Sequence, residues 1–408
     1  MNPERPPGGT TIKVWARIFL PFALGYYLSY GLRTVNAVIA PDLSREFSLT
    51  ASHLGLLTST YFLTFGAFQI PLGILLDRYG ARRVEAALLA VCAAGCALFA
   101  AASGFNALVL GRALIGLGVS ACFMAGLKAF QQWFEPASQP SLIGAIMVAG
   151  TLGALTAATP LEMALPAAGW RGVFWGLTAL ALAAAALLLT VPERGAGIAA
   201  QPLTVQLRGV AAIFAAPVFW RFAPQTCLVV GGFLALQGLW AVPWLMAVGG
   251  LTRSAAAAHL SYLNLALLFG YLGVALFSGR LARIGLPPLR LLTLGSGASV
   301  AMLVLALLDV GPRWLAWSAL GLAMSASNLA YPLLSARFAP EMGGRANTAL
   351  NLAAFVGAFG IQWGFGVLVD AAGAAGAGPA ASFRLAAAVL ALAQLAAFLW
   401  FRAGMNRA

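Results

Sequence analysis

The sequence predicts an all-α integral membrane protein with about twelve transmembrane helices in two pseudo-symmetric six-helix bundles. Only 9% of its 408 residues are charged, while 61% are hydrophobic, and an average globular chain carries about 25% charged residues. Long stretches such as 86–102, 172–191 and 291–308 are apolar and nearly free of charge, as expected of helices that need about 20 residues to cross a hydrocarbon core. They are apolar on every face, whereas the strands of a membrane β-barrel would alternate apolar and polar residues.

Apolar runs bounded by charge, proline or glycine give the helices in order. Those of the first half are expected at 14–37, 53–76, 84–104, 107–131, 141–164 and 171–191. Those of the second half are expected at 219–248, 255–278, 287–308, 313–336, 346–370 and 381–402. A long polar interruption at 192–218 separates the two sets. The sequence therefore predicts an N-terminal bundle at 1–191, a cytoplasmic linker at 192–218 and a C-terminal bundle at 219–408.

The basic residues predict an orientation. Most of the 24 lysines and arginines fall on one side of the membrane when the N-terminus is placed inside, and such residues concentrate in short cytoplasmic loops. We expect both termini in the cytoplasm and the protein in a bacterial inner membrane. The net charge of +13 is dispersed over loops, which argues against a nucleic-acid partner. The expected partners are the lipid bilayer and a small-molecule substrate, and the protein is expected to be a monomer.

Two segments half a chain apart resemble each other. The stretch GVSACFMAGLKAFQQWFEP (118–136) shares a Ser-Ala pair, a late aromatic residue and a closing proline with AMSASNLAYPLLSARFAP (323–340). Internal repeats of this kind are typical of membrane proteins built from duplicated bundles, with a binding site between the bundles near the middle of the membrane. We therefore expect the site to lie between the two halves.

The segment GILLDRYGARR (73–83) crowds four charges into the loop between the second and third helices. Its spacing resembles the G-x-L-x-D-R-x-G-R-R signature of the major facilitator superfamily, with Ala81 where that family often has arginine. The stretch GRALIGLGVSA (111–121) resembles the family's fourth-helix signature, with Ile115 where glutamine is common. The resemblance implies a secondary active transporter that works by alternating access, without a cofactor or enzymatic activity. It also implies a conformational latch made of Gly73, Asp77, Arg78, Gly80, Arg82, Arg83 and Arg112.

The latch has a physical rationale. Asp77, at the end of the second helix, can accept hydrogen bonds from the N-terminus of a neighbouring helix, and the arginines can pair across the seam between the bundles. Such contacts would form in the outward-open state and break in the inward-open state. The corresponding second-half loop SGRLARIG (278–285) has Gly279 where an acid would mirror Asp77, so we expect an asymmetric latch.

In the superfamily, the first and fourth helices of each half line the cavity. Tyr26, Tyr30 and Arg33 fall on one face of the first helix, and Asn36 follows one turn after Arg33. A charge inside a membrane is costly and usually faces a bundle interior or water, so Arg33 is the strongest candidate for binding a substrate anion, with a structural ion pair as the alternative. The other candidates are Gln237, Trp240 and Trp244, expected on one face of the seventh helix, and Asn328, Tyr331 and Gln362.

No acidic residue falls near the middle of a predicted helix, and Glu85 is expected near the inner face. A proton carrier built on a buried carboxylate is therefore not visible, although protons remain a candidate coupling ion. No His, Cys and carboxylate cluster and no Ser, His and Asp cluster falls at one depth, which argues against an enzyme. The function predicted is transport of a small organic solute, either anionic or aromatic.

The stretches QGLWAVPWL (237–245) and GLTRSAAAAHLSYLNLA (250–266) resemble the seventh and eighth helices of CcoA-like (calopterin) copper importers and related flavin transporters. The copper members carry M-x-x-x-M and H-x-x-x-M there, because thioethers suit Cu(I). Here His259 is followed by Leu263 and the methionines are missing, so no metal site is predicted. Copper import, with Cys92 and Cys96 as further soft ligands, stays open as an alternative. A non-transporting receptor or assembly factor on the same fold is the other alternative.

Overall fold

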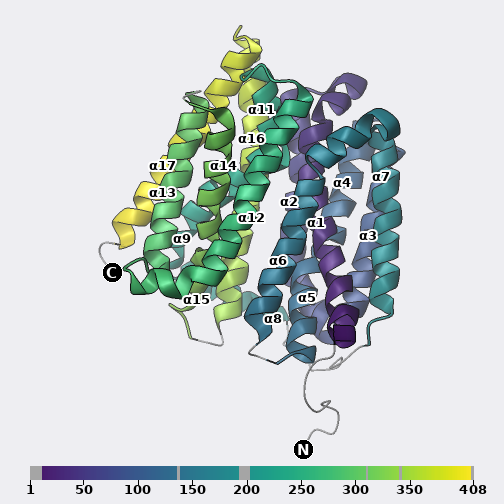
Figure 1. The fold of residues 1–408 in the computed structure, drawn as a ribbon, viewed down its shortest axis with the longest axis vertical. Helices are drawn as coiled ribbons and strands as arrows, with labels where there is room; N and C mark the ends of the chain where they lie inside the picture. The colour runs from purple at the N-terminus through teal and green to yellow at the C-terminus, as the bar shows by residue number, and fades with distance from the viewer. Residues whose placement is uncertain (1–11, 136–137, 193–202, 309–310, 340–341, 406–408) are drawn as a thin grey trace, which may run out of the picture.

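The computed structural model describes residues 12–135, 138–192, 203–308, 311–339 and 342–405, which are mainly helical. Two groups of helices stand side by side in Figure 1, the first half on the right and the second half on the left. The first half contains α1 (Ile12–Phe47), α2 (Ala51–Tyr79), α3 (Ala81–Ala100), α4 (Phe105–Gly118), α5 (Cys122–Trp133), α6 (Gln139–Thr156) and α7 (Thr159–Leu189).

The second half is more interrupted, because several of its helices contain π-helical or 3-10 turns. It contains α9 (Phe219–Gln225), η2 (Thr226–Val230), α10 (Gly231–Ala235), η3 (Leu236–Trp240), α11 (Ala241–Ala247), α12 (Arg253–Arg283), α13 (Pro288–Leu307), α14 (Arg313–Met324), η4 (Ser325–Leu329), α15 (Ala330–Ser335), α16 (Gly343–Ala374) and α17 (Pro379–Met405). The segments α9 to α11 follow one another without a gap and form one apolar candidate span. The segments α14, η4 and α15 also follow one another without a gap.

The helices are long and apolar enough for a membrane. Within the described residues, eight of them qualify as candidate spans, or nine when the two arms of α2 are counted as one bent span. The arms of α2 meet at 57° next to Pro71, where proline removes a backbone hydrogen bond and kinks the helix. The prediction of an all-α integral membrane protein is confirmed.

Several predicted helix ends were wrong. The first helix continues past residue 37 to Phe47, with Pro41 inside it, and ends where Ser48 takes a positive φ of 51°. The helix predicted at 141–164 ends at Thr156, and the chain from Thr159 onward is part of α7. Gly169, with a φ of 63°, makes the kink inside α7, because a left-handed backbone is readily adopted only by glycine.

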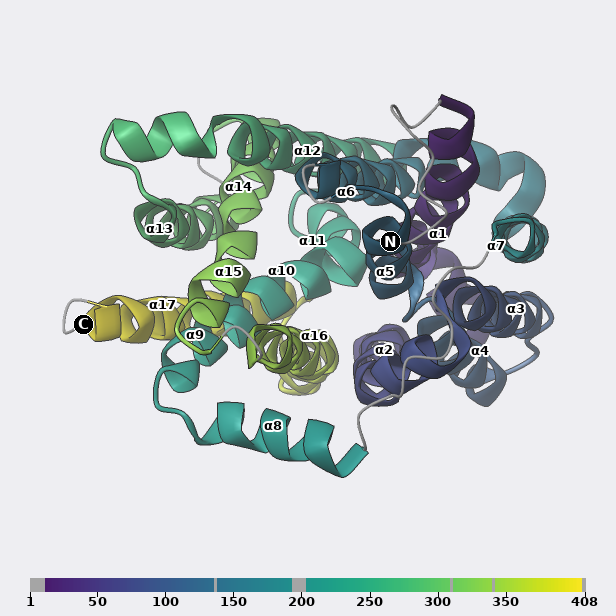
Figure 2. The ribbon, with the colours of Figure 1, turned by 90° about the horizontal axis from the view of Figure 1, so that it is seen from below.

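The predicted linker at 192–218 contains a helix. The segment α8 (Leu203–Ala215) lies beside the second half, away from the middle of the molecule in Figure 2. Ile213 is fully buried against the second half, in a cluster with Phe219 and Leu350. Residues 193–202, which include Glu193, Arg194 and Gln201, fall outside the described residues.

The two halves meet along α2 and α16, which lie side by side in Figure 2. In Figure 1, α1 rises from the lower end, where the N-terminus is marked, so that the turn between α1 and α2 lies at the upper end. Helix α2 therefore runs downward and carries Asp77 in its last turn at the lower end, while α16 runs upward and carries Asp370 near its end, beside the α1–α2 turn. The two helices of this seam are antiparallel.

Candidate functional site

Arg33 lies at the seam between the halves, on α1. Its side chain is 6% exposed, and its guanidinium carbon lies 4.5 Å from the ring centroid of Tyr30. Four more rings surround it at 5.6–6.0 Å: those of Tyr61, Phe62 and Phe65 from α2, and that of Phe355 from α16. Because Phe355 belongs to the second half, the guanidinium contacts both halves.

The charge of Arg33 has no acidic partner. Among the described residues no carboxylate oxygen lies within 4.0 Å of it, and its buried Nε atom has no hydrogen-bond partner. Aromatic faces attract a cation by about 0.5–2 kcal/mol, which is small compared with the cost of burying an isolated charge. The site can therefore accept an anion. A structural ion pair, the alternative for Arg33, is not seen in this conformation.

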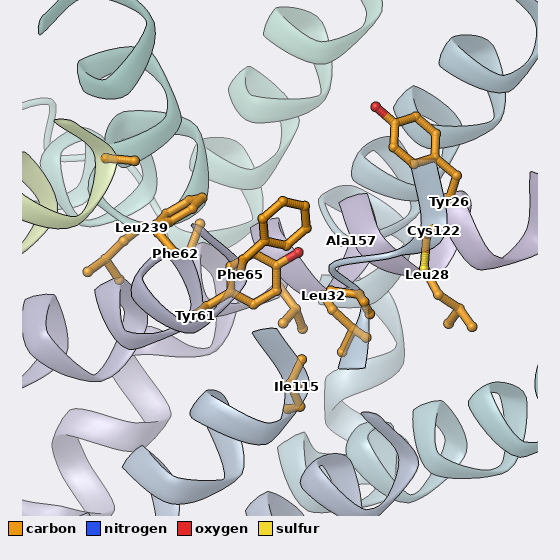
Figure 3. Close-up of a cluster of buried hydrophobic side chains, with 14 of the residues drawn as sticks. Tyr26, Leu28, Leu32, Tyr61, Phe62, Phe65, Ile115, Cys122, Ala157 and Leu239 are labelled. Carbon is orange, nitrogen blue, oxygen red and sulfur yellow. The ribbon is translucent and has the colours of Figure 1, made fainter. Parts of the chain in front are cut away.

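The aromatic residues of α2 around Arg33 were missed in the sequence. Figure 3 shows Phe62 and Phe65 close together beside Tyr61, with Leu32 of α1 nearby and Tyr26 further away. Tyr61 and Phe65 stack with their ring centroids 5.9 Å apart, and Phe65 lies 4.6 Å from Phe355 across the seam. Their signal was the run TYFLTF at 60–65, in which Tyr61 and Phe65 share a helix face.

The other candidates on α1 divide between the site and the interior of the first half. Tyr26 and Tyr30 lie together, with ring centroids 5.0 Å apart. Asn36 is 1% exposed, and its Nδ2 donates to Thr58 Oγ1 of α2 at 2.9 Å. The tyrosines continue toward Arg33, whereas the amide nitrogen of Asn36 is already used in a contact between two helices of one half.

Gln237, Trp240 and Trp244 do not share a face, which corrects the sequence prediction. Gln237 Nε2 donates to Asn264 Oδ1 of α12 at 2.6 Å, Trp240 Nε1 donates to the backbone oxygen of Gln362 in α16 at 2.9 Å, and Trp244 packs on Trp317 of α14. The physical reason is the π-helical turn at η3. Its hydrogen bonds span one residue more than in an α-helix, so spacing based on 3.6 residues per turn fails there.

Three candidates of the second half lie near the seam or near tyrosines. The side chain of Gln362 is fully buried, and neither its oxygen nor its nitrogen has a hydrogen-bond partner. Tyr331 Oη donates to Asn351 Oδ1 at 3.1 Å, and Asn328 lies within hydrogen-bonding reach of Tyr271 on α12. Tyr271 was not predicted from the sequence. An unpartnered buried amide such as that of Gln362 is rare, because buried polar groups normally find a partner.

Arg112 lies far from the rest of the predicted latch, which corrects its assignment to it. It is fully buried in the first half, where its Nη1 donates to the backbone oxygen of Leu32 at 2.9 Å and its guanidinium carbon lies 5.2 Å from the centroid of the Tyr61 ring. Tyr61 precedes Asp77 by sixteen positions on α2, or roughly 24 Å of helix at 1.5 Å per residue.

At the lower end, Asp77, Arg78 and Arg82 of the predicted latch make contacts within the first half. Asp77 Oδ1 forms a 2.5 Å ion pair with Lys128 Nζ of α5. Arg82 Nη1 donates to the backbone oxygen of Val191 at 2.9 Å, and the guanidinium of Arg78 lies 5.2 Å from the ring centroid of its neighbour Tyr79. Gly80, with a φ of 83°, separates α2 from α3, while Gly73 and Arg83 lie within these two helices.

At the upper end, polar contacts cross from one half to the other. Arg253 Nη1, at the start of α12, forms a 2.6 Å ion pair with Asp42 Oδ2 of α1, and its Nε lies 3.8 Å from Glu162 Oε1 of α7. The hydroxyl groups of Thr159 and Ser261 lie 2.8 Å apart. The halves are thus joined at the upper end.

Glu85 lies near the lower end of α3, and its side chain is buried inside the first half, which the sequence did not indicate. It is 0% exposed, and the Cys122 thiol is the polar group beside its carboxylate, whose oxygens form no hydrogen bond with the described residues. Its carboxylate packs against the backbone of α1 at Gly25. The burial of this carboxylate could not be predicted from the sequence, because its position near the start of α3 does not indicate which face of the helix is covered.

The soft-metal candidates are not grouped into a site. His259 bonds through Nδ1 to the backbone oxygen of Ala255 at 2.7 Å, while Cys92 and Cys96 are buried in the first half. Among the described residues, no three His, Cys, Asp or Glu side chains are placed to hold a metal ion together.

Comparison with known proteins gives the family. A model of the Major Facilitator Superfamily matches residues 22–362. The chain is 29% identical over 171 residues to a probable sulfoacetate transporter, SauU, of Cupriavidus necator, a match that covers 42% of this chain and 40% of the relative. It is 34% identical over 111 residues to the nitrate/nitrite transporter NrtP of Picosynechococcus, covering 27% of this chain and 21% of that one. The matched parts are thus less than half of either relative.

Solved structures agree on the fold. A bacterial homologue of the human lysosomal transporter Spinster, in an inward-facing and unoccupied conformation, superimposes with a TM-score of 0.77. The superposition covers 96% of this chain and 97% of that one at 20% sequence identity. This likeness concerns the arrangement of the helices.

Proposed function

The chain belongs to the Major Facilitator Superfamily, and on that basis we propose that it transports a small organic anion across a membrane by alternating access. The observation that carries the substrate class is Arg33, a buried guanidinium at the seam of the two halves with aromatic neighbours and no carboxylate within 4.0 Å among the described residues. A guanidinium is permanently charged and binds a carboxylate or a similar oxyanion through two parallel hydrogen bonds.

The names of the relatives support an anionic rather than a neutral aromatic substrate. Sulfoacetate carries two anionic groups and nitrate carries one, and each is named as the cargo of a relative. We propose that Arg33 binds the anionic group and that Tyr26, Tyr30, Asn328, Tyr331 and Gln362 complete the site. The buried and unpartnered amide of Gln362 suits a further polar group of the substrate. Asn36, Gln237, Trp240 and Trp244 support the site through the helix contacts described above.

Uptake into proteoliposomes tests this proposal. Purified protein would be assayed with radiolabelled sulfoacetate, a radiolabelled sugar acid and labelled nitrate. We expect saturable uptake of at least one organic anion that an excess of the unlabelled compound abolishes. Uptake of nitrate without uptake of any organic anion would show that the substrate is an inorganic anion and would contradict the proposed organic one. Saturable uptake of Cu(I) with none of any anion would overturn the proposal, as would the absence of all uptake by folded protein.

Protons are the proposed coupling ion. Glu85 supports this because it is a fully buried carboxylate without a charged partner, and a group of this kind can carry a proton. In Glu85→Gln we expect substrate binding to persist while the stimulation of uptake by a pH gradient is lost. Glu46→Gln is the matched control, since Glu46 pairs with Arg171 inside the same half at 2.5 Å. Equal stimulation in Glu85→Gln and wild type would remove Glu85 from coupling.

We propose that the lower end faces the cytoplasm, because the basic residues concentrate there. Because the upper end is joined by contacts between the halves, we propose that this conformation is an inward-facing one, in a bacterial inner membrane. Cysteines placed at Arg208 and at Arg402 test the orientation in intact cells. We expect both to resist a membrane-impermeant thiol reagent added outside, and labelling of either would reverse the orientation.

Copper import remains the alternative to organic-anion transport. His259 is the one residue of the copper-importer pattern in this chain, and its Nδ1 is bonded to a backbone oxygen of its own helix. A ligand role would need its other ring nitrogen and partners from elsewhere. The copper arm of the uptake assay decides between the two functions.

A further inference from the structure

A side chain of the second half caps a helix of the first. Asp370 Oδ1 of α16 accepts a hydrogen bond from the backbone nitrogen of Ala51 at 3.0 Å, and its Oδ2 accepts one from the backbone nitrogen of Ser52 at 2.8 Å. These two residues begin α2. The first N–H groups of a helix have no partner within the helix, and the helix dipole favours a negative charge at that end. The contact is therefore specific and attractive.

The backbones touch at the same place. Gly366 lies one turn before Asp370 on α16, and a Cβ atom there would overlap the backbone oxygen of Ala51 and crowd Ser52 Cα. The capping hydrogen bonds thus form together with a close approach of α16 to the start of α2. A larger side chain at position 366 would hold the two helices apart at the upper end and would break the cap without altering any charge.

The lower end of the same helix pair also has an aspartate and a helix N-terminus, but there the aspartate pairs with a lysine. Because α2 and α16 are antiparallel, the N-terminus of α16 at Gly343 points to the lower end, where α2 ends with Asp77. Asp77 is bonded here to Lys128 of its own half. Each helix of the pair therefore carries an aspartate in its last turns, at the end of the molecule where the other helix begins.

We propose that Asp370 is the upper counterpart of Asp77, and that the protein changes state by exchanging one helix cap for the other. Asp370 caps α2 when the upper end is closed, and Asp77 caps α16 when the lower end is closed. This inference rests on the proposed alternating-access function. Each cap gives its state attractive contacts that the other state lacks, so the intermediate with neither cap is disfavoured and the two end states are favoured.

Other contacts at the upper end limit the expected effect. The ion pair of Arg253 with Asp42 also joins the halves there, so that loss of the Asp370 cap shifts the balance between the states without removing either. Removing a helix cap changes a folding equilibrium by about 5- to 30-fold when it costs 1–2 kcal/mol. We expect a shift of this order in the ratio of the two states.

Distances between spin labels in the full-length protein test the exchange without any substrate. One pair at the exposed positions Ser103 and Ala375 reports on the upper end, and a second at Gln131 and Ala336 reports on the lower end. In lipid nanodiscs, Asp370→Asn should lengthen the upper distance and shorten the lower one relative to wild type. Gly366→Val should do the same through steric separation. Asp77→Asn should not lengthen the upper distance, because loss of a cap that belongs to the lower-closed state can only favour the upper-closed state.

Arg171→Gln is the matched control, since it breaks an upper-end ion pair that lies within the first half, and we expect it to leave both distances unchanged. Thermal melting would confirm that each variant is folded. If the distances changed in Gly366→Val but not in Asp370→Asn, the proposed role of the Asp370 cap would be wrong, while the proposed alternating-access function would still stand. Unchanged distances in every variant would overturn the cycle and the cap together.

Discussion

The two buried arginines of the first half occupy different surroundings. Arg112 is 0% exposed and bonds to the backbone oxygen of Leu32, so its charge is held by α1 and α4 of one half. Arg33 is 6% exposed, lies at the seam and has rings from both halves around it. The Tyr61 ring lies within 6.0 Å of both guanidinium carbons. Both guanidinium groups keep buried nitrogen atoms without a hydrogen-bond partner. Of the two, Arg33 is the one with a ring of the second half beside it, and for this reason we propose the anion site at Arg33.

The largest effect is expected from truncating the structural arginine. Arg112→Ala empties a fully buried space and removes the bond to Leu32, and large-to-small changes in a packed interior cost about 2–5 kcal/mol. We expect a clear fall in melting temperature, while the protein that remains folded binds substrate with near-normal affinity. Calorimetry and binding on the same preparation would check this. If the variant kept its melting temperature but no longer bound substrate, Arg112 would be a substrate-binding residue and its structural role would be wrong.

Arg33→Ala should have the opposite profile. Loss of a hydrogen-bonded charge costs roughly 1.5–3 kcal/mol of binding, or about 10- to 150-fold in affinity. The melting temperature should fall less than in Arg112→Ala, because the lost packing against the rings is partly offset by removal of a buried charge that holds no ion pair among the described residues. Arg33→Lys should lose less, since lysine keeps the charge without the planar fork. Isothermal titration with the transported anion measures the affinity. Normal affinity in a folded Arg33→Ala protein would contradict its role.

Thr58→Val tests whether Asn36 on α1 stabilises the helix packing or binds substrate. It leaves the buried Nδ2 of Asn36 without its 2.9 Å partner, and an unsatisfied buried donor costs about 1–3 kcal/mol. We expect lower stability and unchanged substrate affinity. Asn36 would instead belong to the binding site if affinity fell while the melting temperature stayed the same.

Tyr61→Phe should have the smallest effect. It keeps the ring beside both arginines and removes the hydroxyl, which donates to the backbone oxygen of Ser29 at 3.0 Å and lies within hydrogen-bonding reach of the Arg33 side chain. A typical buried hydrogen bond contributes about 0.5–1.5 kcal/mol, so a small fall in melting temperature and unchanged affinity are expected. A large loss of affinity would show that the hydroxyl itself contacts substrate.

Local patterns along the chain were enough for the membrane fold and the family, and they made Arg33 the proposed anion ligand. The apolar runs gave nearly every helix, because the length and the hydrophobicity of a span are local properties. The motif at 73–83 indicated the family, and the cost of a charge in a membrane singled out Arg33. Helix ends such as those near residues 37 and 164 were wrong, since proline and kinks are tolerated where neighbouring helices support the backbone.

Which residues meet was decided by the tertiary structure. The spacing of Gln237, Trp240 and Trp244 predicted one face, but a π-helical turn directs them to three different helices. Nothing in the residues around Asp370 or Ala51 indicates that they meet, since 319 positions separate them along the chain. Periodicity describes neighbours within one helix, whereas contacts between helices depend on how both halves pack. The sequence by itself therefore determined which segments are helical and that a charge lies within the first helix, and the packing determined which residues surround that charge.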